Sequence, residues 1–304
     1  MKINAYVLAA DPAWIEGSVL SYYPLVERIV VSYDEDGFGW TGAPLDIDQC
    51  LQRLRAIDRD GKLDFRPGHY ARREFFRCPL DNDTYQRQCA LEQAGTDADW
   101  VLQLDTDEII GDASTFTDCL SQADCLRRDA FNYPSLWLYC QATPGWYLEW
   151  CDRGWRRTPG YPGPLAVRAN SRLTLARRMD GSHFHVDLSR RGSRVRVPNG
   201  GAVDRVITAP EAVWHFSMLR DEAWLRRKFI SSGHAHERNW HEEVDGWLWA
   251  RRHPWLKTVI SQFGYGLYKR PLRPARLPSA VDQLAGASRE HPSPIPREKQ
   301  PVAA

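Results

Sequence analysis

The chain has 304 residues, of which 43% are hydrophobic and 26% are charged, and its formal net charge is +1. No apolar run comes near the roughly 18 residues that span a bilayer, so we expect a soluble, folded chain with one large α/β domain or two smaller ones. A net charge so close to zero gives no general attraction to nucleic acid, and we expect no nucleic-acid partner. Seven scattered cysteines without a C-x-x-C pair, and an N-terminus without a signal-peptide pattern, favour the cytoplasm.

Strand and helix patterns alternate through the first 110 residues. Each segment rich in β-branched and aromatic residues is followed by one with helical spacing, as in residues 47–57, where apolar side chains recur on one face. Such alternation predicts an α/β fold with a mixed, mostly parallel sheet flanked by helices. The expected strands are 3–9, 28–33, 63–66 and 100–104, and the expected helices are 13–23, 47–57 and 83–94.

The pattern changes after residue 130. Extended, aromatic-rich segments at 131–142, 173–176 and 212–216 accompany a glycine- and proline-rich loop at 158–164, and a helix is expected over 221–238. Seven prolines between 271 and 301 favour an extended or disordered end of the chain. We therefore divide the chain into a main domain (1–218), a C-terminal helical extension (219–270) and a proline-rich tail (271–304).

The clearest candidate for chemistry is Asp105-Thr106-Asp107, which follows the apolar strand at 100–104. Two carboxylates two residues apart can offer hard oxygen ligands to a divalent cation. Ligands of α/β proteins also bind where strands of the sheet end, which is where this D-x-D sequence lies.

The D-x-D sequence, the strand before it and the arginine-bearing helix around 86–91 resemble the family 2-like glycosyltransferases. Their GT-A fold, which is Rossmann-like, binds a nucleotide-sugar through a D-x-D motif and a divalent metal. The resemblance covers about residues 3–110, with a weaker similarity over 213–236. It implies a GT-A-like catalytic domain over 1–218, with a nucleotide-sugar part at 1–110 and an acceptor part at 111–218.

The same resemblance assigns roles to individual residues. It implies that Asp107 binds Mn²⁺ or Mg²⁺, that Asp105 faces the metal or the ribose, and that His215 supplies one more metal ligand. It favours a UDP-sugar as donor, a saccharide or lipid-linked acceptor, and inversion at the anomeric carbon. The nucleotide contacts that it implies are Ala9, Asp34, Glu35, Lys62, Arg87 and Asp105.

The catalytic base is the part of the pattern that the sequence leaves open. An inverting transferase needs a carboxylate to deprotonate the acceptor hydroxyl, and the candidates are Glu149, Asp152 and Asp187. If none of them serves, a retaining mechanism stays open. A nucleotidyltransferase of the same fold, or a catalytically silent sugar- or lipid-binding protein, are the alternatives. Aromatic residues that could stack on a sugar are Trp137, Trp146, Tyr147 and Trp150.

Two other motifs have competing interpretations. Residues 37–42 form a G-x-G-x-x-G sequence, but the acidic residues 34–36 between strand and glycines would repel a pyrophosphate, so we interpret this match as accidental. His183 and His185 would share one face of a strand and could bind a metal with Asp187, although such pairs are more often structural.

The segment 246–281 has an unusual charge pattern. It contains seven Lys or Arg and no acidic residue, interleaved with Trp247, Trp249, Trp255 and other aromatic residues. This composition suits peripheral contact with the anionic inner face of a membrane, and it equally suits a helix packed on the acidic remainder of the chain.

Overall fold

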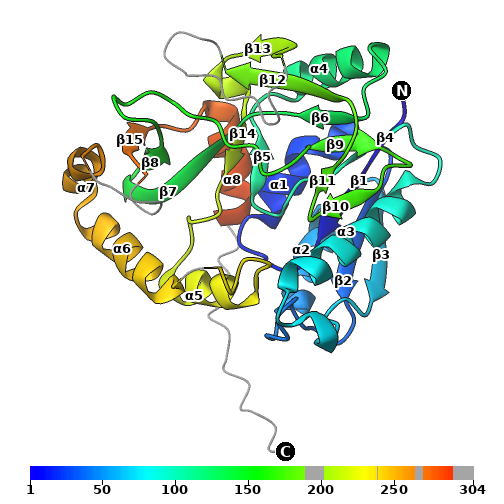
Figure 1. The fold of residues 1–304 in the computed structure, drawn as a ribbon, viewed down its shortest axis with the longest axis horizontal. Helices are drawn as coiled ribbons and strands as arrows, with labels where there is room; N and C mark the ends of the chain where they lie inside the picture. Colours follow the sequence, from blue (N-terminus) through cyan, green and yellow to red (C-terminus); the bar gives the residue numbers. More distant parts are fainter. Residues whose placement is uncertain (189–201, 238, 264–269, 290–304) are drawn as a thin grey trace, which may run out of the picture.

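The computed structural model describes residues 1–188, 202–237, 239–263 and 270–289. The largest sheet among them has the strand order β13-β12-β6-β9-β4-β1-β2-β3 (Figure 1). Neighbouring strands are parallel except at β9, which runs antiparallel to β4 and β6. The strands are β1 (Ile3–Leu8), β2 (Ile29–Asp34), β3 (Leu63–Gly68), β4 (Trp100–Leu102), β6 (Ala130–Asn132), β9 (Ala166–Arg168), β12 (His183–Leu188) and β13 (Arg205–Ile207).

Helices cover both faces of this sheet. Val7 of β1 is buried with Ile15 of α1 and Leu51 of α2, whereas its neighbour Tyr6 is buried with Leu91 of α3 on the other face. Because successive strand residues point to opposite faces, both faces of β1 are apolar, as a parallel sheet requires. The expected α/β fold is confirmed. The helices are α1 (Ile15–Tyr22), α2 (Ile47–Ile57), α3 (Pro79–Gly95) and α4 (Ala113–Cys125).

A second sheet has the order β15-β8-β7-β14-β5. In it β14 runs parallel to β7 and antiparallel to β5, with His215 opposite Glu108. This pairing brings a segment more than a hundred residues away beside the D-x-D sequence. The strands are β5 (Glu108–Ile110), β7 (Ser135–Thr143), β8 (Trp146–Trp150), β14 (Val213–His215) and β15 (Leu272–Ala275), and a separate hairpin joins β10 (Leu173–Leu175) to β11 (Arg178–Met179).

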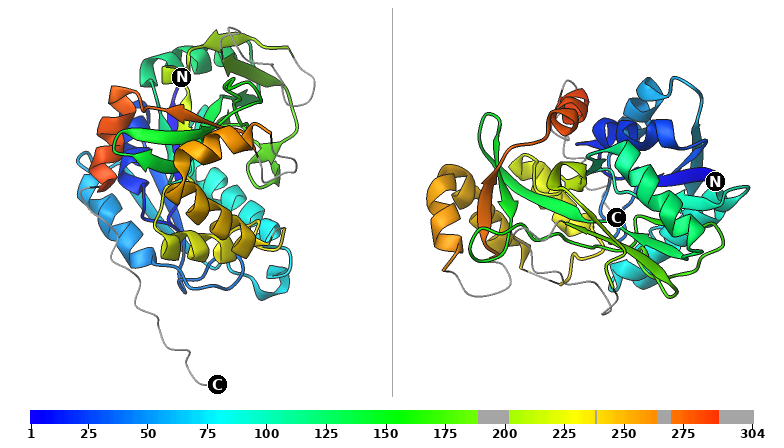
Figure 2. Two further views of the ribbon diagram at one scale, coloured as in Figure 1. Left: turned by 90° about the vertical axis from the view of Figure 1, so that its left-hand side faces the viewer. Right: turned by 90° about the horizontal axis from the view of Figure 1, so that it is seen from above.

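The C-terminal helical extension is confirmed, although its first helix is shorter than expected. Helix α5 (Glu222–Ser231) ends seven residues before the predicted end at 238, and α6 (Trp240–Arg252) and α7 (Pro254–Ser261) follow. These helices lie against β7, β8 and β15 on one side of the molecule (Figure 2). No helix in the described ranges is both long and apolar enough to cross a membrane.

The prediction of a disordered tail is wrong for residues 272–289. Strand β15 pairs with β8, and α8 (Ser279–Arg289) packs on α1, where Val281 and Ala285 are fully buried. Pro274 lies in β15, an edge strand, where proline is accepted, and Pro278 lies directly before α8, where a helix tolerates it. The helices approach closely, since a Cβ on Gly17 would lie 2.6 Å from the carbonyl oxygen of Leu284. The remainder, 290–304, lies outside the described residues.

Candidate functional site

A cavity of about 560 Å³ lies at the carboxyl ends of β1, β2 and β4. Ala9 follows β1, Asp34 ends β2, and Asp105 and Asp107 come shortly after β4, and all four line the cavity. Residues of α3 and α5 complete this part of its wall, among them Arg87 and Lys228. The cavity is therefore at the edge of the sheet where α/β proteins bind ligands.

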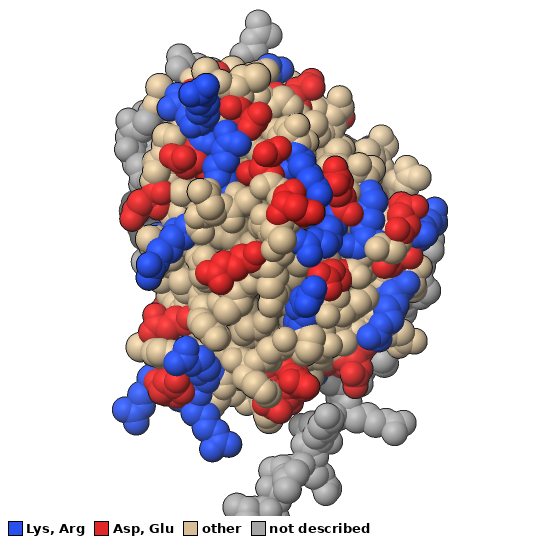
Figure 3. Space-filling view, turned by 90° about the vertical axis from the view of Figure 1, so that its right-hand side faces the viewer, with Lys and Arg blue, Asp and Glu red and all other residues tan. Residues whose placement is uncertain are grey.

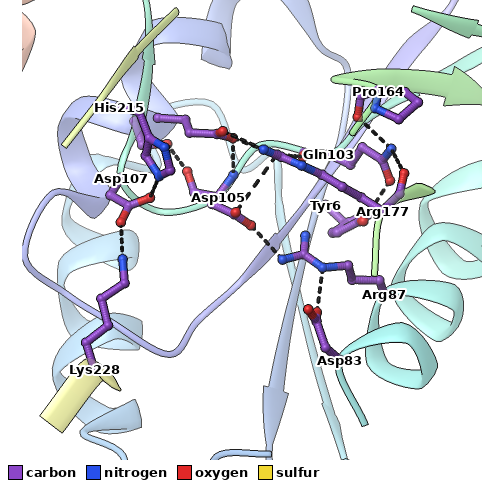
Figure 4. Close-up of polar contacts among 12 residues, drawn as sticks. Tyr6, Asp83, Arg87, Gln103, Asp105, Asp107, Pro164, Arg177, His215 and Lys228 are labelled. Atoms are coloured by element: carbon purple, nitrogen blue, oxygen red, sulfur yellow. Dashed lines mark hydrogen bonds and ion pairs between the residues drawn. The ribbon is translucent and has the colours of Figure 1, made fainter. Parts of the chain in front are cut away.

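Asp105 is held by arginines (Figure 4). Arg87 Nη2 donates a hydrogen bond to its Oδ1 at 2.8 Å, and Arg177 Nη1 lies 3.9 Å from its Oδ2. Burial on its own raises the pKa of Asp105, but the two guanidinium groups outweigh burial and lower this pKa to about 2. About a third of the side chain remains exposed, so Asp105 is an ionised carboxylate that a ligand can reach.

Asp107 is more completely enclosed, and three side chains donate to it. His215 Nε2 lies 3.0 Å from Oδ1, and Arg220 Nη2 lies 2.8 Å from Oδ2, which also accepts a hydrogen bond from Lys228 Nζ. Burial raises the pKa of Asp107, but Lys228, His215 and Arg220 together hold it well below its usual range. Both carboxylate oxygens therefore already have cationic or polar partners.

A buried polar network fixes the position of the D-x-D loop. Glu108 is fully buried and receives two hydrogen bonds from Arg177, and its Oε2 accepts a third from the backbone N–H of Asp105. Gln103 accepts from Tyr6 and donates to the carbonyl of Arg177. Because buried polar groups are costly when unpaired, this network holds the loop in one conformation.

The structure brings four of the six predicted nucleotide contacts to the cavity: Ala9, Asp34, Arg87 and Asp105. The carboxylate of Asp34 also holds the surrounding loops, because it accepts hydrogen bonds from the backbone N–H groups of Phe38, Tyr70 and Ala71.

Glu35 and Lys62 are not among the cavity-lining residues. Glu35 is exposed, and its carboxylate lies 3.8 Å from His69. Lys62 precedes β3, at the opposite end of the sheet, and donates to the carbonyls of Tyr23 and Val26. The structure therefore does not bring Lys62 to this cavity, because the amino and carboxyl ends of parallel strands lie at opposite ends of the sheet.

None of the three base candidates, all within the described residues, lines the cavity. Glu149 is fully buried, and its oxygens accept from Arg157 Nε at 3.0 and 3.1 Å. Burial raises the pKa of Glu149, and Arg157 only partly opposes this effect. Asp187 is also buried and accepts from the hydroxyl of Tyr161 at 3.0 Å. These contacts indicate structural roles for Glu149 and Asp187. Asp152 is not among the cavity-lining residues.

The donor set does not fit a divalent metal. No group of three His, Cys, Asp or Glu side chains with metal-binding geometry occurs within the part of the chain that the structure describes. A metal ion on Asp107 would have to displace Lys228 or Arg220 from Oδ2 and would lie beside both cations. The predicted ligands Asp105, Asp107 and His215 thus do lie around one cavity. The two carboxylates are paired with the protein's own cations, and His215 is hydrogen-bonded to Asp107.

Aromatic side chains form another wall of the cavity. The rings of Trp137 and Trp150 stack with centroids 4.8 Å apart and planes 5° from parallel, and the edge of His215 meets Trp137. Both tryptophans line the cavity, as the sequence suggested, whereas Trp146 and Tyr147 are not among its lining residues. A flat aromatic surface of this kind suits stacking on a sugar or a base.

Several site residues were missed from the sequence. Asp83 precedes Arg87 by one helical turn and pairs with it at 2.6 Å, so the i,i+4 spacing could have indicated it. Arg220 and Lys228 reach Asp107 from more than a hundred residues away, and no local pattern signals such a contact. Glu237 and Glu243 are further carboxylates in the cavity wall.

No protein-family model and no curated protein matches the chain. Solved structures similar to it include mannose-6-phosphate isomerase from Helicobacter pylori (11% identity, 44% of this chain, 51% of that chain, TM-score 0.29). Another is 4-diphosphocytidyl-2C-methyl-D-erythritol synthase from Anaerococcus prevotii (11% identity, 55% of this chain, 70% of that chain, TM-score 0.29). A third is mannose-1-phosphate geranyltransferase from Thermus thermophilus (16% identity, 56% of this chain, 51% of that chain, TM-score 0.27). The chain thus matches about half the length of the first and third. At these TM-scores the similarities carry no argument about function.

Proposed function

We propose that this protein is a glycosyltransferase that moves a sugar from a nucleotide-sugar, with a UDP-sugar favoured, to an acceptor hydroxyl. The observation that carries the proposal is the arrangement around one cavity of Asp34, the two D-x-D carboxylates and Lys228, at the carboxyl ends of parallel strands. The proposal also rests on the resemblance of residues 3–110 to family 2-like glycosyltransferases.

In this proposal Asp34 and Asp105 orient the nucleoside. Asp34 ends β2, and Asp105 is an ionised, partly exposed carboxylate. Carboxylates accept hydrogen bonds from ribose hydroxyls and from base N–H groups, so both side chains suit the nucleoside end of the donor. Arg87 fixes Asp105 in this orientation.

Lys228 stabilises the leaving nucleoside diphosphate. It is the most exposed of the basic groups that contact Asp107, with 24% of its side chain accessible, and it lines the cavity together with Arg227. Negative charge grows on the diphosphate as the bond to the sugar breaks, and a preorganised cation lowers the energy of that state. Arg220 remains behind Asp107 and keeps the pair aligned.

The acceptor side is formed by the stacked pair Trp137 and Trp150 and by carboxylates of the helical extension. The rings cover each other and Arg270 lies over Trp150, so the parts of the pair that line the cavity would contact the acceptor sugar. Glu237 and Glu243 replace the three predicted residues as candidates for the base that deprotonates the acceptor hydroxyl, because both line the cavity.

A product assay tests this function. The protein is incubated with UDP-, GDP- or CDP-sugars and a saccharide acceptor, and the released phosphates are identified. We expect a nucleoside diphosphate to be released in an acceptor-dependent manner, and Lys228→Ala to slow its release while Lys62→Ala does not. A parallel incubation holds nucleoside triphosphates and a sugar phosphate. Pyrophosphate released there would instead establish the nucleotidyltransferase alternative, and binding without any product in either incubation would establish the silent one.

A further inference from the structure

Helix α7 exposes its apolar side and buries its polar side. Four large apolar residues are about half exposed, whereas Thr258 and Ser261 on the other side are only 2% and 3% exposed. This is the reverse of the arrangement in a helix that packs on a core. The exposed residues are Trp255 (47%), Leu256 (51%), Val259 (51%) and Ile260 (47%), and Phe263 just after the helix is 75% exposed.

Hydrogen bonds hold α7 in this orientation. Ser261 Oγ accepts from the backbone N–H of Leu272 at 2.9 Å and donates to the carbonyl of Thr258. Gln262 Nε2 donates to the carbonyl of Leu272 at 3.1 Å. Polar side chains at this end of the helix thus satisfy the backbone N–H and C=O of Leu272 on the edge strand β15. Rotating the helix to bury its apolar side would break these hydrogen bonds.

Basic residues surround the exposed apolar face. Arg251 and Arg252 are exposed at the end of α6, directly before α7, and Lys257 lies on α7 itself. The sequence from 246 to 281 contains no acidic residue, and the acidic residues of α6 lie at its other end. The opposite side of the molecule differs, because Figure 3 shows acidic and basic side chains interspersed there.

We propose that α7 docks on the surface of a bilayer that contains anionic lipids. The helix would lie in the plane of the interface, with Trp255, Leu256, Val259 and Ile260 among the upper acyl chains and Arg251 and Arg252 at the headgroups. Figure 2 (left) shows α7 and α6 on the outer face of the molecule, where a flat surface can reach them.

The positive charge around α7 favours a membrane, and not a second copy of the chain, as the partner of its exposed apolar face. A symmetric dimer through this face would bring the cations of two copies together, and α7 itself has no acidic residue to pair with them, which is unfavourable. Docking would also place the bilayer next to the site, because Lys257 and Arg270 line the cavity. With the bilayer beside the cavity, the acceptor of the proposed transfer would be a lipid-linked one. Only this inference about the acceptor rests on the proposed function.

Vesicle flotation tests the docking. The full chain is mixed with phosphatidylcholine vesicles that contain or lack phosphatidylglycerol, and the bound fraction is measured at low and high salt. We expect binding to the anionic vesicles, weakened by salt. The double variant L256S/I260S removes the apolar contact and should lose most of this binding, and R251S/R252S should weaken it about 30-fold.

Matched variants control for general effects. Leu126 and Val206 are exposed to similar degrees (57% and 52%) on other elements, so L126S/V206S should bind vesicles like the wild type. R59S/R77S removes two exposed arginines far from α7 in sequence and should also behave like the wild type. Thermal denaturation verifies that every variant folds.

Three results would overturn the proposal: no binding of the wild type to anionic vesicles, equal loss in the control variants, or self-association that L256S/I260S abolishes. Nucleotide binding is measured on the same variants. Because α7 contributes only Lys257 to the cavity wall, L256S/I260S should keep wild-type nucleotide binding, so that failure of the docking and failure of the proposed function give different results.

Discussion

Lys228 Nζ donates a hydrogen bond to Oδ2 of Asp107, the carboxylate that the D-x-D pattern assigns to a metal ion. The ammonium group thus lies where the sequence predicts a divalent cation. An ammonium group can neutralise a phosphate as a metal ion does, although with one charge instead of two. The site consequently carries its own positive charge, and this is the main difference between the structure and the expectation from the sequence.

The ion pairs of the D-x-D loop predict how stability depends on pH. The folded-state pKa of Asp105 is lowered to about 2, and that of Asp107 is lowered as well, so both contribute stability that is present above their ordinary pKa near 3.8. This stability should be lost as the pH falls from about 4 to about 2. Urea denaturation over this range measures it.

Asp105→Asn isolates the contribution of Asp105, because other carboxylates with lowered pKa values also affect how the free energy of unfolding of the wild type changes with pH. The variant should be about 1–3 kcal/mol less stable at neutral pH, since Arg87 loses a charged partner, and it should depend less on pH. An unchanged slope in the variant would show that Asp105 is not ion-paired in the folded state.

The packing of α8 on α1 predicts opposite effects for two glycine substitutions. Gly17→Ala would place a Cβ 2.6 Å from the carbonyl of Leu284 and should destabilise the fold by about 1–3 kcal/mol. Gly286→Ala, on α8, meets no atom within 4 Å and should be neutral or stabilise by up to about 1 kcal/mol, because alanine favours the helix. Thermal denaturation of both variants checks this. Equal melting temperatures would contradict the close packing of α8.

The contacts of Glu149 predict that it is not the catalytic base. Glu149→Gln leaves the Arg157 guanidinium without its charged partner and should lower stability by about 1–3 kcal/mol. The turnover number should stay close to that of the wild type, since the side chain is fully buried outside the cavity wall. Steady-state kinetics measures this. A loss of about 100-fold in kcat with unchanged stability would restore Glu149 as the base.

The sequence predicted the local parts of the fold well. Helix 47–57 was predicted with its observed ends, because its apolar spacing is regular, and the first strands were placed within a few residues. Helix α3 begins at Pro79, four residues before the expected start at 83, because proline is favoured at the first position of a helix. The difference at α8 has another cause: the prolines around it favour disorder, but packing of Val281 and Ala285 on α1 decides the structure there.

The site could be predicted where its residues lie at the carboxyl ends of predicted strands. Asp34, Asp105 and Asp107 follow strands, and the topology of a parallel sheet brings strand ends together. His215, which the resemblance assigns to a metal ion, lies beside Asp107 because β14 pairs with β5. Lys228, by contrast, reaches Asp107 only because α5 crosses the open edge of the sheet, and nothing in the sequence around it indicates this contact.

The central claim is that the cavity binds a nucleotide through the protein's own cations. Isothermal titration calorimetry with UDP, GDP and CDP in the presence of EDTA tests it on the wild type, on Lys228→Ala and on Lys62→Ala as the matched control. We predict that one of the three nucleotides binds without metal, that Lys228→Ala weakens this binding about 10- to 100-fold, as expected for a lost charge-assisted hydrogen bond, and that Lys62→Ala leaves it unchanged. Failure of all three nucleotides to bind, or binding that appears only when Mn²⁺ is added, would contradict the account.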